Sequence, residues 1–268
     1  MPELTEVEGF ARAMTRWCGG RRVTALDLLD ETVQHTVERS PVGMTVRSVW
    51  RRGKHLILTL DDAELMIHLR MTGQLLPGEG AAFVRFVLRV HEAAPIQLID
   101  PRRLAELHVL APGGAARRLQ GLGEEPFPEL RSGRWWQERL GHTRRPLKAA
   151  LMDQALVAGL GNIAASEILW SAQLHPARAA STLTELEWTR VATATHTFLH
   201  ALMDTQDPER LVYINRGGEN PFSVYQRTRC PRCGGALQRL TQQARSTFLC
   251  PRCQPTPGAE APGARVGG

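Results

Sequence analysis

Residues 230–253 read CPRCGGALQRLTQQARSTFLCPRC, and this stretch holds four of the five cysteines of the chain. Two Cys-x-x-Cys pairs, Cys230 with Cys233 and Cys250 with Cys253, are separated by 16 residues. This spacing is typical of a zinc ribbon, in which four thiolates close a tetrahedral site and leave no open position for catalysis. The sequence therefore predicts one structural Zn²⁺, held by these four cysteines around a β-hairpin.

The clustering of the cysteines also bears on the compartment. Four clustered cysteines favour a metal site over a disulfide framework, which indicates a reducing, intracellular and cytoplasmic location. No run of 18 or more apolar residues occurs, so we expect no membrane span. The N-terminus carries acidic residues and no hydrophobic core of a signal peptide.

The charge of the chain favours a polyanionic partner without proving one. Lysine and arginine number 33 against 27 acidic residues, for a net charge of +6. From 223 to 254 there is no acidic residue and there are six arginines, a composition suited to phosphates, although zinc ribbons also serve as protein-binding or stability modules. The only two lysines are Lys54 and Lys148, which suggests tasks that arginine cannot perform; chance survival is the alternative.

The chain begins Met1-Pro2-Glu3. Removal of the initiator methionine would leave the secondary amine of Pro2 at the N-terminus. An α-amino group titrates near neutral pH, so part of it is unprotonated and able to form a Schiff base with a carbonyl-type carbon. Glu3 is placed to assist with acid–base chemistry. Many proteins begin Met-Pro without using it, so this motif needs support from the rest of the chain.

An amphipathic helix is predicted over residues 4–17, since apolar residues recur there at spacings of three and four. Thr5-x-x-Glu8 resembles a capping box with Thr5 as N-cap, and Gly19-Gly20 would end the helix. Pro2 and Glu3 would then precede a helix N-terminus, where anions are stabilised.

Residues from about 22 to 110 show the pattern of short strands, which suggests a sandwich or barrel. One of the intervening loops carries Met71, and another carries Asp100-Pro-Arg102-Arg-Leu104. Taken alone, Met71 is an ordinary core residue and the second loop an ordinary solvated turn. The expected strands are 45–49, 55–60, 64–71, 83–90 and 96–99.

After a Gly- and Pro-rich linker at 113–130, the periodicity becomes helical, with helices expected near 131–140, 146–156, 162–173 and 183–203. The turn Gly159-Leu-Gly161-Asn162 allows close approach of a ligand to the backbone. Asn162 would be the N-cap of the next helix, at a terminus suited to a phosphate. A glycine-rich turn is weak evidence by itself. Residues 255–268 are predicted to be a disordered tail.

Taken together, the motifs resemble the formamidopyrimidine-DNA glycosylase/endonuclease VIII family, and they are closer to the formamidopyrimidine branch. They occur in the order of the family from residue 1 to about 254. The matching stretches are Met1-Pro2-Glu3-Leu4 with Glu6; Arg51-Arg52-Gly53-Lys54; His68-Leu69-x-Met71-x-Gly73; Asp100-Pro101-Arg102-Arg103; Leu122-Gly123-x-Glu125-Pro126; Lys148 to Asp153; Gly159-x-Gly161-Asn162-Ile163 with Ala165-Ser166-Glu167; and Arg245 to Cys250.

The resemblance implies an α+β protein of three parts. These are an N-terminal catalytic β-sandwich with a leading helix at 1–112, a helix–two-turns–helix domain at 131–222 and a C-terminal zinc-finger β-hairpin at 223–254. It implies a bifunctional DNA glycosylase and AP lyase of base excision repair. The partner would be double-stranded DNA containing damaged bases or abasic sites, bound by a monomer, and the damaged nucleotide would be extruded from the stack.

The resemblance also implies roles for individual residues. Pro2 would attack C1′ of the damaged nucleotide, Glu3 would assist ring opening and proton transfer, and β- and δ-elimination would follow from the Schiff base. Lys54 is also expected among the catalytic residues, and with Asn162 and Arg245 it would grip the phosphates beside the lesion. The other expected site residues are Met71, Arg102 and Leu104 at the void in the duplex; His68 on the DNA; and Glu6 and Lys148 near the lesion pocket.

The sequence departs from the family pattern at several positions. Thr5 replaces a proline and Leu104 a phenylalanine, while Arg70 replaces a glycine and Ala164 a tyrosine. The stretch 213–227 is shorter than the loop that covers 8-oxoguanine in formamidopyrimidine-type members, so the preferred lesion stays open. The main alternative function is a non-catalytic zinc-finger protein that binds damaged DNA. A zinc-ribbon protein of transcription or translation would leave the N-terminus unexplained.

Overall fold

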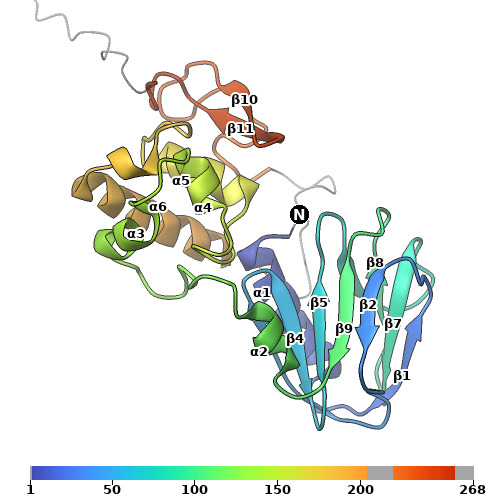
Figure 1. Ribbon diagram of the computed structural model, residues 1–268. Helices are drawn as coiled ribbons and strands as arrows, with labels where there is room; N and C mark the ends of the chain where they lie inside the picture. The colour runs from blue at the N-terminus through green and yellow to red at the C-terminus, as the bar shows by residue number, and fades with distance from the viewer. Residues whose placement is uncertain (1, 204–219, 257–268) are drawn as a thin grey trace, which may run out of the picture. The chain divides into compact units, whose positions relative to one another are not determined.

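The computed structural model describes residues 2–203 and 220–256, and it divides into two compact units. One comprises the described residues up to Leu122 together with Leu202 and Met203, and the other comprises Gly123–Ala201 with the described residues from 220 onward (Figure 1). Residues 257–268 of the predicted tail and residues 213–219 of the short stretch 213–227 lie outside the described residues. Among the described residues, no helix has the length and apolar character needed to cross a membrane.

The first unit is a β-sandwich with a leading helix, which confirms the predicted α+β class. Every pairing among its described strands is antiparallel except that of β2 with β9. One sheet has the order β1 (Val23–Leu28), β7 (Val84–Val90), β8 (Ile96–Ile99) and β6 (Gln74–Pro77). The other has the order β2 (Gln34–Val37), β9 (Glu106–Leu110), β5 (Glu64–His68), β4 (His55–Leu60) and β3 (Val46–Arg52).

The alternation along β4 shows how the sandwich buries both faces of one sheet. Leu56 and Leu58 enter the core between the two sheets, together with Phe86 and Leu98 of the other sheet. Ile57 points to the opposite face, as period-two strand geometry requires. There it packs in a smaller cluster with Leu119 of helix α2 (Gly114–Leu119). The predicted linker 113–130 therefore includes a helix that covers the outer face of the sheet.

Helix α1 (Leu4–Cys18) packs on β3 and β4 and ends before Gly19, as predicted. Its N-cap is Glu3 and not Thr5, so the predicted capping box was placed two residues too late. The Glu3 side chain accepts the backbone N–H of Glu6, and the Glu6 side chain accepts that of Glu3. This reciprocal arrangement fixes Glu3 in an extended conformation at the start of the helix.

Four strands of the first unit fall outside the five predicted runs: β1, β2, β6 and β9. Their sequences lack a clean strand pattern. Gln34–Val37 is a mostly exposed edge strand, Gln74–Pro77 ends in a proline, and Glu106–Leu110 buries a glutamate and a histidine. Pairing with neighbouring strands, rather than local propensity, forms these elements.

The second unit carries the helical part and the zinc-finger hairpin. Its helices are α3 (Gly133–Leu140), α4 (Leu147–Leu151), α5 (Asn162–Ser171) and α6 (Glu185–Met203), with a 3₁₀ turn at Ala180–Thr182, and its hairpin is β10 (Gln238–Gln242) with β11 (Arg245–Leu249). Helix α4 is shorter than predicted, because Asp153 accepts the backbone N–H of Ala155 and starts a turn. The N-cap of α5 is Gly161, so Asn162 is its first helical residue and not its cap.

Candidate active site and metal centre

The start of α1 brings two acidic side chains together beside Pro2. Pro2 and Glu3 are buried, and the N–H of Glu3 donates to Glu6 Oε2 across 2.7 Å. Burial and the nearby charge of Glu3 raise the pKa of Glu6 to about 7, against the opposing effects of the Glu3 N–H and of Lys54. A carboxyl with this pKa exchanges a proton near neutral pH, which suits a general acid or base.

Lys54 reaches the same place from the turn between β3 and β4. Gly53 before it has a φ of 57°, a conformation that favours glycine, and it turns the chain so that the lysine is buried. The charge of Lys54 lowers the pKa of Glu6 and that of His68. The structure thus brings Pro2, Glu3, Glu6 and Lys54 of the predicted site into one neighbourhood of the first unit.

His68 ends β5 and packs edge-on against His55, with ring centroids 4.5 Å apart. Burial first, and then the charges of His55, Arg70 and Lys54, lower the pKa of His68 to about 2, so the ring is neutral at physiological pH. Its Nδ1 accepts the backbone N–H of Arg70 across 3.1 Å. A neutral ring that accepts at Nδ1 carries its proton on Nε2, which can donate to an oxygen without adding charge.

Met71, Arg102 and Leu104 lie in two loops of the first unit and are exposed. Met71 is 43% exposed and Leu104 is 39% exposed, so both side chains are available to contact a ligand. Met71 is therefore not the core residue that its side chain alone would suggest.

In the second unit, Lys148 and Asn162 meet at the hairpin. The Lys148 ammonium donates to Asn162 Oδ1 (2.7 Å), Thr247 Oγ1 (2.8 Å) and the carbonyl of Ser246 (3.1 Å). Asn162 Nδ2 donates to the same Ser246 carbonyl across 3.0 Å. These bonds join α4, α5 and β11. Lys148 is only 1% exposed, whereas Arg245 at the start of β11 is exposed.

Two residues that organise this region had no predicted role. Glu167, buried on α5, accepts the backbone N–H groups of Ser223, Val224 and Tyr225. Gln154 accepts the N–H of Gly159 and donates to two carbonyls, and so shapes the glycine turn before Asn162. A lone glutamate in the apolar run of α5 is the one signal in the sequence that could have indicated the first of these roles.

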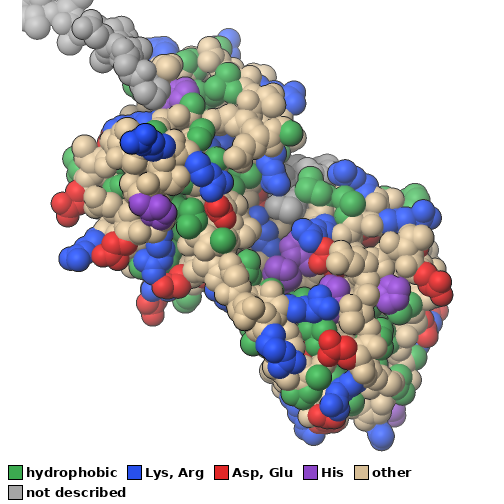
Figure 2. Space-filling view, in the orientation of Figure 1, with side chains coloured by type: hydrophobic (Ala, Val, Ile, Leu, Met, Phe, Trp, Pro, Cys, Tyr) green, Lys and Arg blue, Asp and Glu red, His purple; other side chains and the backbone are tan. Residues whose placement is uncertain are grey.

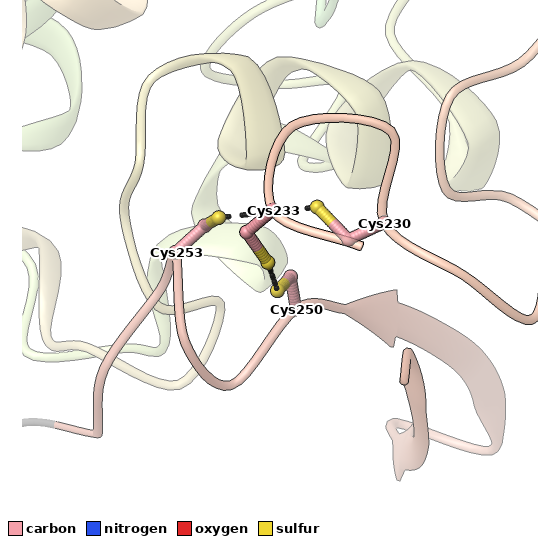
Figure 3. A group of neighbouring side chains, drawn as sticks. All are labelled: Cys230, Cys233, Cys250 and Cys253. Atoms are coloured by element: carbon pink, nitrogen blue, oxygen red, sulfur yellow. Dashed lines mark hydrogen bonds between the residues drawn. The ribbon is translucent and has the colours of Figure 1, made fainter. Parts of the chain in front are cut away.

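The four cysteines form the predicted metal centre, and their sulfur atoms all lie within 4.8 Å of one another (Figure 3). Cys230 and Cys253 have sulfurs 3.8 Å apart, and those of Cys233 and Cys250 are 3.5 Å apart. A tetrahedron with Zn–S bonds of about 2.3 Å has edges of about 3.8 Å, so the site fits one structural Zn²⁺.

Helix α5 contacts this metal centre through Trp170. The indole Nε1 donates to Cys230 Sγ across 3.3 Å. Arg232 lies over the indole ring at 4.4 Å and donates to the carbonyls of Trp170 and Ser171. A hydrogen bond to a coordinating sulfur is a common outer-shell contact in metal sites.

Basic side chains occur on both units. On the face shown in Figure 2, lysine and arginine side chains are spread over each unit, with acidic ones interspersed. Several arginines are engaged in ion pairs, among them Arg51 with Glu8 and Arg145 with Asp153. Net charge alone therefore does not define a binding surface.

The chain matches three family descriptions in order. Residues 1–107 match the formamidopyrimidine-DNA glycosylase N-terminal domain, residues 122–207 its H2TH domain, and residues 229–256 the zinc finger found in FPG and IleRS. The formamidopyrimidine-DNA glycosylase of Chloroflexus aurantiacus is 35% identical, with 96% of this chain and 98% of that protein covered. That of Streptococcus pneumoniae is 31% identical, with 95% and 99% covered.

Solved structures agree with these matches. The formamidopyrimidine-DNA glycosylase of Lactococcus lactis bound to DNA with an abasic site superposes with a TM-score of 0.83 at 25% identity, covering 95% of this chain and all of that one. The same protein in complex with DNA containing FAPY-dG gives a TM-score of 0.84, with the same identity and coverage. The domain matches occur in the same order along the chain, the relatives align over nearly their whole length, and the four-cysteine centre fits the zinc finger. The chain therefore belongs to the formamidopyrimidine-DNA glycosylase family.

Proposed function

We propose that this chain is a bifunctional DNA glycosylase and AP lyase in which Pro2 is the nucleophile. The observation that carries this assignment is the cluster at the start of α1, where Pro2 lies beside Glu3, Glu6 and the buried Lys54. The family shown above supports the same activity. Its relatives are named formamidopyrimidine-DNA glycosylases, and their solved structures hold damaged DNA.

The proposed reaction begins after removal of Met1, when the Pro2 nitrogen attacks C1′ and the C1′–base bond breaks. Glu6, with a pKa of about 7, is suited to deliver a proton to the departing base. Glu3 assists opening of the sugar ring, which gives an iminium between Pro2 and C1′. The iminium accepts the electron pair released when the C2′ proton leaves, so that the 3′ phosphate departs by β-elimination. Loss of the C4′ proton from the resulting conjugated iminium then expels the 5′ phosphate by δ-elimination. Water releases Pro2 at the end.

The proposed DNA contacts divide between the units. In the first unit, Lys54 and the Nε2–H of His68 bind phosphate oxygens. Three further side chains enter the space left by the extruded nucleotide: Met71, Arg102 and Leu104. In the second unit, Asn162 and Arg245 bind phosphates. Lys148, which is buried and donates to three acceptors, orients Asn162. Phosphate contacts of this kind fix register and orientation.

The substrate class we propose is oxidised bases and abasic sites in double-stranded DNA. One related structure, MutM at 25% identity, is bound to DNA containing carbocyclic 8-oxo-G. The short 213–227 stretch leaves the ranking of lesions to experiment. We also propose that the chain acts as a cytoplasmic monomer, with domains at 1–112, 131–222 and 223–254.

Borohydride trapping tests the function. The purified chain would be incubated with duplexes carrying an abasic site, 8-oxoguanine, formamidopyrimidine or an oxidised pyrimidine, and adducts would be mapped by mass spectrometry. We expect an adduct at Pro2, and loss of base excision in Pro2→Gly with DNA binding retained. No adduct on any duplex, from protein shown to lack Met1, would favour the non-catalytic binder of damaged DNA.

A further inference from the structure

We propose that Arg70 and Glu106 are positioning residues that lock two loops together, so that the side chains filling the duplex void act as one preformed wedge. The Met71 loop comprises residues 69–73, and the Leu104 loop comprises residues 100–105. The inference rests on the proposed function, which assigns side chains of both loops to the void. It adds two residues that have no role in that assignment.

The sheet brings the two loops to the same edge. Strands β5 and β9 are antiparallel neighbours, and His68, the last residue of β5, pairs with Glu106, the first residue of β9. The Met71 loop leaves the sheet where the Leu104 loop enters it. Loops that emerge side by side need few additional bonds to behave as one body.

The first bond between the loops is made by Thr72, whose hydroxyl donates to Asp100 Oδ1. Asp100 is completely buried, and its carboxylate also accepts the N–H groups of Leu104 (2.6 Å) and Ala105 (2.7 Å). It accepts the N–H of Arg102 across 3.2 Å as well. One carboxylate thus shapes the Leu104 loop from within and holds the loop that carries Met71.

The second bond is the ion pair of Arg70 with Glu106. Arg70 Nε donates to Glu106 Oε1 across 2.8 Å, and its Nη2 donates to the same oxygen. Glu106 is buried on β9, so the guanidinium is anchored on a strand rather than on a mobile side chain. The Arg70 N–H also donates to His68, which fixes the backbone of the arginine.

The backbone of Arg70 indicates that its side chain has a purpose. Arg70 has a φ of 50°, in the left-handed region that glycine adopts at no cost and other residues adopt with strain. A glycine would suit this position better if only the turn mattered. The anchored guanidinium gives the strained residue a compensating contact that a glycine could not make.

The two bonds stand on either side of the exposed apolar side chains. Arg70 and Thr72 flank Met71 in its loop, and Asp100 and Glu106 bound the loop of Leu104. Held at both flanks, these side chains lose less conformational freedom when they enter DNA, and preorganisation of this kind strengthens binding and speeds insertion. It also offsets the smaller stacking surface of Leu104.

The experiment follows wedge insertion directly. A duplex would carry a tetrahydrofuran abasic analogue with 2-aminopurine opposite it, and stopped-flow fluorescence would report when that base loses its stacking. The variants are Arg70→Gly, which suits the backbone, Glu106→Gln and the double variant. The matched control is Arg47→Ala, which removes one arginine and breaks the Arg47–Asp61 ion pair in the same unit but outside both loops.

We expect insertion to slow by about threefold to tenfold in Arg70→Gly and less in Glu106→Gln, with the double variant no slower than Arg70→Gly. Arg70→Lys should restore part of the rate, and Arg47→Ala should match the parent. Thermal melting of each variant ensures that a slow rate does not reflect unfolding.

Parental insertion rates in both single variants, or effects that simply add in the double variant, would overturn the proposal. A slow rate in Arg47→Ala equal to that of Arg70→Gly would do the same, because the effect would then be loss of charge. A different result would show that the proposed function is wrong. The parent would then give no borohydride adduct with a natural abasic site, whatever the variants do to the fluorescence.

Discussion

Glu3 and Glu6 cap the first helix for each other: the N–H of Glu3 donates to Glu6 Oε2 across 2.7 Å, and the Glu3 side chain accepts the N–H of Glu6. A capping box usually only begins a helix. Here it also holds two carboxyl groups beside Pro2 and forces Glu6 into a half-buried position that favours its protonated form. The same pair of residues therefore caps the helix and would supply the proposed acid–base chemistry.

The raised pKa of Glu6 predicts a pH-dependent stability. Its value of about 7 in the folded chain exceeds the ordinary 4.5, so the protonated form is favoured by folding, and the stability it confers is lost as the pH rises through 7. The free energy of unfolding should fall by on the order of 2 kcal/mol between pH 5 and pH 8 from this group. Urea titrations of Glu6→Gln should show a flatter dependence. The exposed Glu31→Gln serves as control, and a parental slope in Glu6→Gln would contradict the assignment.

Arg245→Ala should weaken DNA binding on all sequences alike. Arg245 is exposed on β11 and is assigned to a phosphate, so its loss should reduce the slope of log K against log salt by about 1. Fluorescence anisotropy at several salt concentrations measures this. An unchanged slope would remove Arg245 from the phosphate contacts.

Lys148→Met should weaken binding without changing the salt slope. The buried ammonium orients Asn162 and touches the hairpin, and its removal leaves acceptors on Asn162 and Thr247 without their donor. Such a loss costs about 1–3 kcal/mol of stability. The same anisotropy series, with Arg245→Ala beside it, distinguishes a positioning role from a direct contact. A slope reduced as in Arg245→Ala would show that Lys148 reaches a phosphate itself.

Removal of the metal should be visible in the emission of Trp170. Its indole donates to Cys230 Sγ, so loss of zinc changes the environment of the ring and frees the finger from the C-terminal end of α5. A strong chelator should release one zinc per chain, with a fluorescence change and loss of DNA binding. Trp170→Phe keeps an aromatic ring, smaller than the indole, but lacks the N–H donor, and it should release zinc faster. Equal release rates in the parent and in Trp170→Phe would show that this hydrogen bond does not help to retain the metal.

The zinc site could be predicted from the sequence because its geometry is encoded in the spacing of four residues. The same holds for α1 and for the strand His55–Leu60, which show clear periodicity. The strands Gln34–Val37 and Glu106–Leu110 lack such a pattern, because pairing partners far along the chain create them. Local propensity does not contain that information.

The site residues were predicted chiefly from the resemblance to a family. The resemblance did not predict the burial and the hydrogen-bond partners of these residues. Sequence reasoning placed Thr5 and Asn162 as helix caps from residue type and local spacing, whereas Glu3 and Gly161 occupy those positions. The burial of Lys148, the ion pair of Arg70 with Glu106 and the role of Asp100 all depend on side chains that meet only in the folded chain. No spacing rule could have indicated them.

Both lysines of the chain are buried, Lys54 in the first unit and Lys148 in the second. Reagents that modify primary amines, such as succinimidyl esters, therefore find no exposed lysine to acylate. In a chain that begins with Pro2, the terminal secondary amine would be the one remaining aliphatic amine for such chemistry. Labelling stoichiometry would then count free N-termini, and a single fluorophore could be attached at the position where the sugar is expected to bind.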